Sequence, residues 1–424
     1  MFKWQRIGAI FTKLFGGRAP KTSSFTPQLE ALESREVLST SFGLKQVLTS
    51  GSGPVSVAVG DFTSDGRKDL IIANEYDGTM TLFKGRGAGL FGRGHDIASG
   101  LSFPSAVVAG HFDADSFLDF AVTDTGTNQI KFFHGDGTGS FSSGQGDTIG
   151  SGPGGESLPR ALAKGDFNED GHDDLVVANF HGKSVSVFLS SADGTSYTRL
   201  DLPTLPSDSP LQSSSLSVSV ADFNNDNHLD FVVGFMGGFK VFLGTGGDTF
   251  TEQTAQSTSS FNGPIFAVGD FDRDGNQDIA LIADFGLVQS SIQIRFGDGS
   301  GGFSETHEVL ISPRVAVVAS VVVCDFNQDG NDDLAITTNR LRRGTGILGR
   351  GQLLLIPGKG DGSFQPVQYY TMPLLPGGLA VSDLDRDGRP DIVVTINGNL
   401  LEPDHRVLIL KSEPPPAVRG WFGR

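Results

Sequence analysis

Short apolar stretches recur along the whole chain, separated by turns rich in Gly and Asp. In the first such unit, Val55, Val57 and Val59 alternate with small residues, and a β-branched run follows at 70–72. A second apolar arm at 80–83 leads into a Gly-rich turn that ends in an aromatic residue. Period-two alternation, short apolar runs and Gly-rich turns are typical of antiparallel β-strands. We therefore expect four strands in each unit and no helix.

The unit recurs seven times, and each copy carries a variant of the first one, GDFTSDGRKDLIIAN. The copies lie at 60–74, 110–124, 165–179, 221–235, 269–283, 324–338 and 382–396. Units of about 50 residues with four strands each are typical of propeller blades. The repeats therefore predict an all-β fold, a seven-bladed β-propeller of four-stranded antiparallel blades.

The two ends of the repeat region complement each other. The seventh unit stops after its third strand, at 407–410, whereas residues 41–48 resemble a fourth strand without a unit of their own. Pairing these segments would close the ring and remove two open sheet edges. We expect the propeller to span 41–411, after a basic leader (1–40) and before a Pro-rich tail (412–424).

The loop between the first and second strands of each unit has polar residues at positions 1, 3, 5 and 9, usually with Gly at position 6. The candidate metal ligands are Asp61, Thr63, Asp65 and Asp69; Asp113, Asp115 and Asp119; Asp166, Asn168, Asp170 and Asp174; Asp222, Asn224, Asp226 and Asp230; Asp270, Asp272, Asp274 and Asp278; Asp325, Asn327, Asp329 and Asp333; Asp383, Asp385, Asp387 and Asp391. Alternate oxygen ligands around a tight turn suit Ca²⁺, with a backbone carbonyl at position 7. We expect five to seven ions.

Two other kinds of loop share part of this pattern. An EF-hand would need Glu at position 12, where this chain has apolar residues such as Ile72, and helices rather than strands on both sides. Asp, Asn and Gly also favour plain Asx turns without metal. That alternative is strongest for loop two, where His111 replaces Asp at position 1 and Ser116 replaces Gly. Loops one and four come next, because loop one has Thr63 at position 3 and loop four has Asn227 in place of Gly.

Charge favours the metal interpretation. The formal net charge is −17, and 23 of the acidic residues are Asp at the loop positions, so without them the charge would be +6. Seven Ca²⁺ ions would bring the total to −3. This acidity argues against a nucleic-acid partner, which needs clustered Lys and Arg. No apolar run reaches the ~18 residues of a membrane span, and Cys324 has no partner for a disulfide.

The succession of strand, DxDxDGxxD loop, LVVAN-like strand and GxGxF turn resembles FG-GAP and VCBS-type repeats, as in the integrin α-subunit propeller and many bacterial surface proteins. The resemblance covers about 41–411 and implies a propeller with Ca²⁺ in its loops. Residues 28–39 are similar to the LEPR-XLL segment of exported planctomycete proteins, which implies export to the cell surface or beyond. We expect a monomeric extracellular adhesion or binding scaffold for a protein or polysaccharide.

The alternative function is a polysaccharide-active enzyme, such as a Ca²⁺-dependent lyase on a propeller scaffold. The catalytic motifs HExxH, GxSxG and the P-loop are missing from the sequence, so we expect no enzyme. Histidines such as His134 are interpreted as surface residues. One basic cluster, Arg340, Arg342, Arg343 and Arg350, could bind a carboxylated or sulfated glycan, although a solvated loop is the alternative. We place it on the face opposite the Asp loops.

Overall fold

The computed structural model describes residues 41–413, with gaps at 144–146, 149–157, 182–183, 192, 195, 205–216, 259–264, 285–289, 313–315, 342–347, 374 and 400–401. The predicted leader and most of the predicted tail lie outside the described residues. Every regular element within the described part is a β-strand.

Seven antiparallel sheets form the molecule, as predicted, and each contains one Asp loop. Blade one contains β2 (Pro54–Gly60), β3 (Asp69–Asn74), β4 (Thr79–Phe83) and β7 (His95–Ala98), with a small hairpin of β5 (Gly85–Gly87) and β6 (Leu90–Phe91). Blade two contains β8 (Pro104–Gly110), β9 (Asp119–Asp124), β10 (Gln129–Gly135), β11 (Phe141–Ser143) and β12 (Asp147–Thr148). Blade three contains β13 (Pro159–Gly165), β14 (Asp174–Asn179), β15 (Ser184–Ser190) and β16 (Tyr197–Pro203).

The remaining four sheets follow the same order. Blade four contains β17 (Ser217–Ala221), β18 (Asp230–Phe235), β19 (Gly238–Gly244), β20 (Phe250–Glu252) and β21 (Gln256–Ser257). Blade five contains β22 (Ile265–Gly269), β23 (Asp278–Asp284), β24 (Ser290–Gly297) and β25 (Phe303–Ser312). Blade six contains β26 (Ala316–Cys324), β27 (Asp333–Leu341), β28 (Leu348–Ile356) and β29 (Gln368–Met372). Blade seven contains β30 (Pro376–Ser382), β31 (Asp391–Asn399), β32 (Glu402–Glu413) and β1 (Ser41–Thr49).

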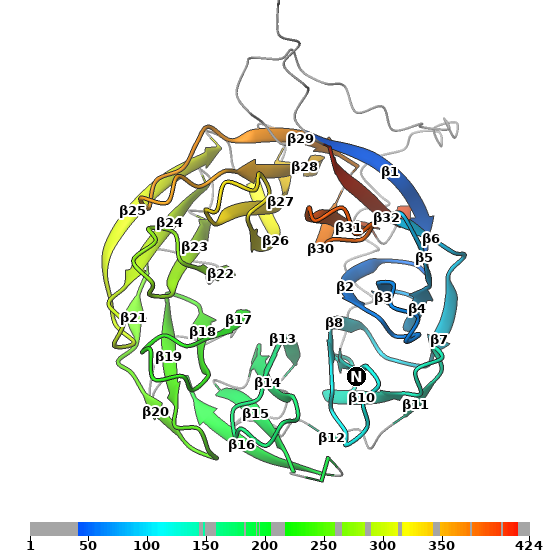
Figure 1. Cartoon of the computed structure of the whole chain (residues 1–424), viewed down its shortest axis with the longest axis horizontal. Coiled ribbons are helices and arrows are strands. Elements are labelled where there is room, and N and C mark those ends of the chain that lie inside the picture. The colour runs from blue at the N-terminus through cyan, green and yellow to red at the C-terminus, as the bar shows by residue number, and fades with distance from the viewer. Residues whose placement is uncertain are drawn as a thin grey trace, which may run out of the picture. The chain divides into compact units, whose positions relative to one another are not determined.

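The blades form a ring in which the first strand of each blade lies innermost (Figure 1). Inner strands of consecutive blades contact each other all the way round, and β30 of blade seven contacts β2 of blade one. Four inner strands begin at a proline, where no ladder hydrogen bond is lost. The pairs β5–β6, β12 and β21 are additional short strands that the sequence pattern does not predict.

Blade seven is assembled from both ends of the repeat region. Strand β1 pairs antiparallel with β32, from Ser41 opposite Glu413 to Thr49 opposite Arg406, with an irregularity between Leu44 and Gln46. The outer strand of this blade therefore comes from the N-terminal side of the chain, while its other three strands come from the C-terminal side. Strand β32 extends two residues beyond the predicted end of the propeller.

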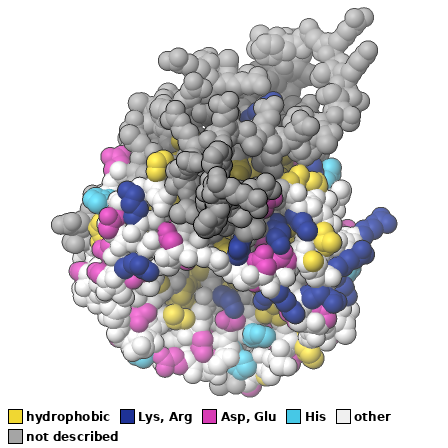
Figure 2. Space-filling model, turned by 45° about the horizontal axis from the view of Figure 1, so that its top comes forward, with side chains coloured by type: hydrophobic (Ala, Val, Ile, Leu, Met, Phe, Trp, Pro, Cys, Tyr) yellow, Lys and Arg dark blue, Asp and Glu magenta, His cyan; other side chains and the backbone are white. Residues whose placement is uncertain are grey.

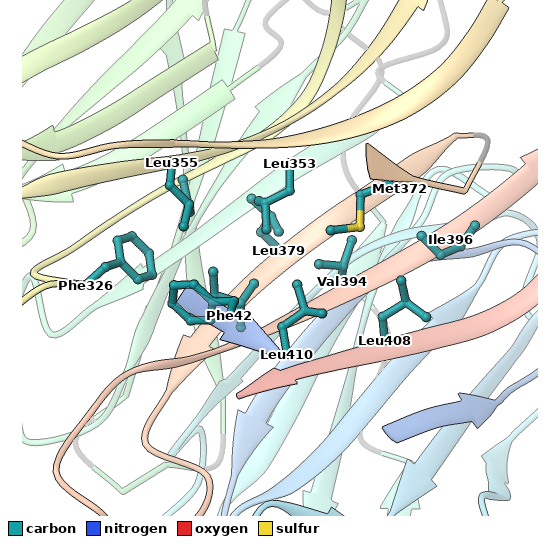
Figure 3. Close-up of a cluster of buried hydrophobic side chains, with 12 residues drawn as sticks. Phe42, Phe326, Leu353, Leu355, Met372, Leu379, Val394, Ile396, Leu408 and Leu410 are labelled. Atoms are coloured by element: carbon teal, nitrogen blue, oxygen red, sulfur yellow. The ribbon is translucent and has the colours of Figure 1, made fainter. Parts of the chain in front are cut away.

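Aromatic residues connect neighbouring blades. The residue at loop position 2 is buried in every blade. In blades one to five it also contacts an aromatic residue of the next blade. That residue is the Phe after the Gly-rich turn in blades two, four, five and six, and Tyr197 in blade three. Phe271 of blade five, for example, lies 5.7 Å from Phe364 of blade six, centroid to centroid. At the junction of blades six and seven, Phe326 contacts Phe42 of β1 edge to face at 5.9 Å (Figure 3). Leu384 and Phe91 share the cluster between blades seven and one.

The surface carries both signs of charge. Figure 2 shows acidic and basic side chains interspersed over the visible face, with Lys and Arg gathered along its right side. Among the described residues, no helix has the length and apolarity that crossing a membrane requires.

Candidate metal centres

Six of the seven Asp loops share one backbone conformation. The residue at position 4 has a positive φ in each of them, from 51° at Ser64 to 65° at Arg386. Position 6 has a positive φ as well, and it is Gly except at Asn227, which has a φ of 67°. These left-handed residues explain the Gly at position 6, because other side chains are strained there. In loop two neither Ala114 nor Ser116 belongs to the positive-φ residues, so that loop folds differently.

The carboxylate at position 9 is buried in every loop, with an exposed fraction of 0 or 1%. In loop five, Oδ1 of Asp278 accepts a hydrogen bond from the backbone N–H of Gly297 at 2.9 Å. Its Oδ2 accepts one from Phe271, also at 2.9 Å. The same two bonds recur in loops two, three, four, six and seven. Position 9 therefore ties the loop to the end of the third strand.

Burial makes the ionised form of these aspartates costly. Desolvation raises the pKa of Asp278 and Asp333 to about 7, against the backbone hydrogen bonds that lower it. It raises the pKa of Asp174, Asp230 and Asp391 to about 6. A cation beside such a carboxylate would favour its charged form and offset the cost of burial.

Positions 1 and 5 fold the loop on itself. In six loops, Oδ2 at position 1 accepts a hydrogen bond from the backbone N–H at position 6. In all seven loops, Oδ1 at position 5 accepts one from the N–H at position 7. Such bonds also form in Asx turns without metal. They shape the loop, but they do not discriminate between the two interpretations.

Loops five and seven bring three carboxylates together. Oxygens of Asp270, Asp272 and Asp278 lie within 4.8 Å of one another, as do those of Asp383, Asp385 and Asp391. Oδ1 of Asp270 and Oδ1 of Asp385 are buried and accept no hydrogen bond. A buried oxygen without a donor is costly, and a cation removes that cost. These two residue sets therefore fit a hard divalent cation such as Ca²⁺, for which carboxylate oxygens are typical ligands.

The end of the third strand also contributes to loop seven. Nζ of Lys411, on β32, contacts Oδ2 of Asp385 and lies 3.3 Å from Oδ2 of Asp387. These carboxylates raise the pKa of Lys411, the hydrogen bond with Asp385 having the largest effect. The ammonium group thus competes with any ion for the carboxylates of loop seven. Sequence reasoning missed this lysine because it lies 20 residues beyond the loop.

Loops three, four and six carry Asn at position 3, and its side chain is used inside the loop. Nδ2 of Asn168 donates to Asp170 at 3.2 Å, Nδ2 of Asn224 to Asp226 at 2.8 Å, and Nδ2 of Asn327 to Asp329 at 2.9 Å. In loop one, Oγ1 of Thr63 donates to Oδ2 of Asp69 at 3.0 Å. For these four loops, ion binding stays a prediction from the sequence.

In blade two, the interpretation of His134 as a surface residue is wrong. Its side chain is 23% exposed, and Nδ1 lies 3.1 Å from Oδ2 of Asp113 and 3.6 Å from Oδ2 of Asp119. The three residues form the third group in the described part of the chain whose ligand atoms all lie within 4.8 Å. Asp115 lies outside this group. The pattern of the loop could not reveal His134, because the residue stands at the end of the third strand.

Comparison with known proteins agrees with this architecture. The model of the FG-GAP-like repeat matches residues 61–122, 166–233 and 222–281, which contain Asp loops one to five. The chain is a seven-bladed β-propeller that contains FG-GAP-like repeats over these residues. No curated protein matches its sequence significantly.

Solved structures of low sequence identity are similar to this chain. BBS1N, in a complex with ARL6DN, is 11% identical, covers 89% of this chain and 98% of its own, and superimposes with a TM-score of 0.57. A lectin from Agrocybe aegerita that recognises non-reducing terminal N-acetylglucosamine is 16% identical over 76% of this chain and 80% of its own, with a TM-score of 0.49. A mutant of AofleA from Arthrobotrys oligospora is 10% identical over 77% and 90%, with a TM-score of 0.47.

The predicted basic cluster falls at the edge of the described part. Arg342 and Arg343 lie outside the described residues, while Arg340 belongs to β27 and the exposed Arg350 to the neighbouring β28. A concave feature lies elsewhere, where β1 of blade seven meets blade one. It is a cavity of about 730 Å³. Its lining consists of 46–49 of β1, the next two residues 50–51 and, from blade one, Thr81, Phe83, Arg86, 91–94 and Asp96. Sequence reasoning missed it because strands from the two ends of the propeller form it.

Proposed function

We propose that this FG-GAP propeller is an exported scaffold that binds Ca²⁺ in its Asp loops and binds a protein or glycan ligand without catalysis. The observation that supports it most directly is the pair of buried, unbonded oxygens in loops five and seven, each inside a group of three carboxylates. Positions 1, 3, 5 and 9 of loops one and three to seven would hold the ions. Each ion would offset the repulsion among the carboxylates of its loop.

The ions would act on stability rather than on chemistry. Position 9 ties its loop to the third strand, and position 2 of the same loop contacts the next blade, so an ion that fixes the loop also fixes a junction between blades. An extracellular location supports weak sites, because Ca²⁺ is abundant outside cells. The resemblance of residues 28–39 to an export segment favours the same location.

The cavity between blades seven and one is the candidate ligand site. Its wall includes Arg86 and Arg93, whose guanidinium groups can only act as donors, and Asp96, which accepts a hydrogen bond from Thr81 at 2.8 Å. Donors and acceptors around a cavity of this size suit the hydroxyl and carboxylate groups of a sugar. The site would depend on the pairing of β1 with β32, since β1 provides one wall.

Two measurements on the full chain test the proposal. Native mass spectrometry should count about six bound Ca²⁺ ions. The melting temperature in millimolar Ca²⁺ should exceed the melting temperature in chelator by several degrees, since one site at 100-fold excess over its Kd contributes about 2.7 kcal/mol. A chain without ions and without a shift would refute Ca²⁺ binding and leave plain Asx turns.

Ligand binding is tested separately on a glycan array, with the variant Arg86→Ala/Arg93→Ala as the comparison and Arg160→Ala, on β13, as the control. Loss of a signal in the double variant alone would support the cavity. An array without any signal would exclude a glycan as the ligand. Ultraviolet absorption of unsaturated products released from uronate polymers would instead favour the lyase alternative.

A further inference from the structure

We propose that blade two carries a site for a borderline transition metal of the Zn²⁺ type, formed by Asp113, Asp119 and His134. The proposal goes beyond the function above and does not depend on Ca²⁺ binding in the other loops.

The distances fit such an ion. Nδ1 of His134 lies 3.1 Å from Oδ2 of Asp113 and 3.6 Å from Oδ2 of Asp119. A tetrahedral ion with ligands about 2.1 Å away places those ligands about 3.4 Å apart. Both nitrogen–oxygen distances are therefore close to the spacing that a common small ion requires, and all three ligand atoms lie within 4.8 Å of one another. Asp119 is held in place by backbone hydrogen bonds from Phe112 and Gly135, both at 2.8 Å.

The imidazole nitrogen points at the same two carboxylates. Nδ1 of His134 is buried and lies at ion-pair distance from Asp113 and Asp119, without a well-aligned hydrogen bond to either. A metal ion bound to Nδ1 and to both carboxylates would satisfy all three groups together. The other interpretation, a protonated imidazole that serves as an internal cation, is an outcome of the test below.

Loop two has also lost features that Ca²⁺ would need. His111 replaces the carboxylate at position 1, and its Nδ1 donates to the carbonyl of Phe117 at 3.0 Å. That carbonyl, at position 7, is the backbone ligand expected in the other loops. The turn lacks the two left-handed residues that the other six loops share. Two oxygen ligands are thus removed from this loop, one by substitution and one by a hydrogen bond.

The third strand supplies a nitrogen ligand in their place. The residues that correspond to His134, one before the N–H that binds position 9, are Lys84, Leu189, Leu243, Phe296, Pro357 and Lys411. Blade two alone has an imidazole there. Ca²⁺ prefers oxygen ligands, whereas imidazole together with carboxylate suits Zn²⁺ and its neighbours. Three protein ligands leave a fourth position for water, and the side chains of Asp113 and His134 are 24% and 23% exposed.

The test uses the full chain, stripped of metal and titrated with Zn²⁺ in the presence of millimolar Ca²⁺. We expect one Zn²⁺ per chain by native mass spectrometry and calorimetry, and visible absorption bands of a four-coordinate ion when Co²⁺ is the probe. His134→Ala should weaken Zn²⁺ binding by at least about 100-fold, while His95→Ala, which removes an exposed histidine of blade one, should leave it unchanged.

A second variant tests the choice of metal. His111→Asp/His134→Leu gives blade two the first position of the Ca²⁺ loops and the leucine of blades three and four. This variant should no longer bind Zn²⁺. If its melting temperature equals that of the parent, the loss of Zn²⁺ results from the changed ligands and not from unfolding. Zn²⁺ binding that survives in His134→Ala, or a parent chain that binds no Zn²⁺, would overturn the proposal. The second result would favour the alternative, in which a protonated His134 serves as the cation between the two aspartates. Neither result bears on Ca²⁺ in the other loops.

Discussion

Asp278→Asn separates the two roles of the buried carboxylate at position 9. Asn has the same size but keeps only one acceptor, so one of the N–H groups of Phe271 and Gly297 loses its partner. A buried donor without a partner costs about 1–3 kcal/mol. The substitution also removes a charge whose burial raises the pKa from 3.8 to about 7. At about 1.4 kcal/mol for each pKa unit, removing that charge is worth on the order of 4 kcal/mol at pH 8 in the absence of a cation.

The sign of the effect should therefore depend on Ca²⁺. In metal-free buffer at pH 8, the variant should be at least as stable as the parent, because relief of the buried charge outweighs the lost hydrogen bond. In Ca²⁺ at 100-fold excess over Kd, the parent gains about 3 kcal/mol from one bound ion that the variant does not bind, so the stability of the variant relative to the parent should fall by about 3 kcal/mol when Ca²⁺ is added. At about 2 °C for each kcal/mol, this change amounts to about 5 °C.

Differential scanning calorimetry of both proteins, with and without Ca²⁺, measures the four melting temperatures. Asp248→Asn, at an exposed position in the Gly-rich turn of blade four, is the matched control and should shift neither condition. An equal decrease of the melting temperature with and without Ca²⁺ would refute the reasoning, because Asp278 would then act only through its two hydrogen bonds.

Three further predictions follow from the same structure. Lys411→Leu removes the ammonium group that competes with Ca²⁺ for Asp385, so calorimetry should detect tighter Ca²⁺ binding at one site. An unchanged affinity would show that Lys411 does not compete with the ion in loop seven. Phe271→Ala should destabilise the chain by about 3–5 kcal/mol with and without Ca²⁺, because a fully buried ring is lost between two blades. Phe103→Ala removes a ring that is 54% exposed and should cost far less. Chemical denaturation measures both free energies of unfolding. Without metal, the melting temperature should rise as the pH falls from 8 to 5.5. Five position-9 aspartates have pKa values of about 6–7 in the folded state, above the ordinary 3.8, so the folded state takes up protons in this range and is stabilised. Saturating Ca²⁺ should abolish this rise, and a rise that persists in Ca²⁺ would contradict ion binding at these aspartates.

The repeats predict the fold because each unit carries its own local signals. Proline marks the beginning of four inner strands, the Asp loop marks the turn after them, and Gly marks the left-handed position 6. These signals depend on residues a few positions apart. The strands that they delimit are therefore found where the sequence places them, and the repeat number gives the number of blades.

The site was predicted less completely, because its remaining parts come from distant residues. His134 and Lys411 reach their loops only through the register of the second and third strands, about 20 residues along the chain. The hydrogen bonds of position 9 to the N–H after the third strand have the same origin. A pattern within the loop contains no information on that register. The cavity beside β1 depends on a pairing between strands separated by more than 350 residues.

The pairing of β1 with β32 also determines how the propeller would respond to mechanical force. Ser41 lies opposite Glu413, so a pull applied across these two residues acts at one end of an antiparallel pair. The inter-strand hydrogen bonds would then break one after another, as in a zipper, instead of sharing the load in shear. Tension between a tether on one side and a cargo on the other would peel β1 away first, and with it one wall of the cavity beside blade one. A surface protein built this way would release its ligand at low force, while the other six blades keep their own strands.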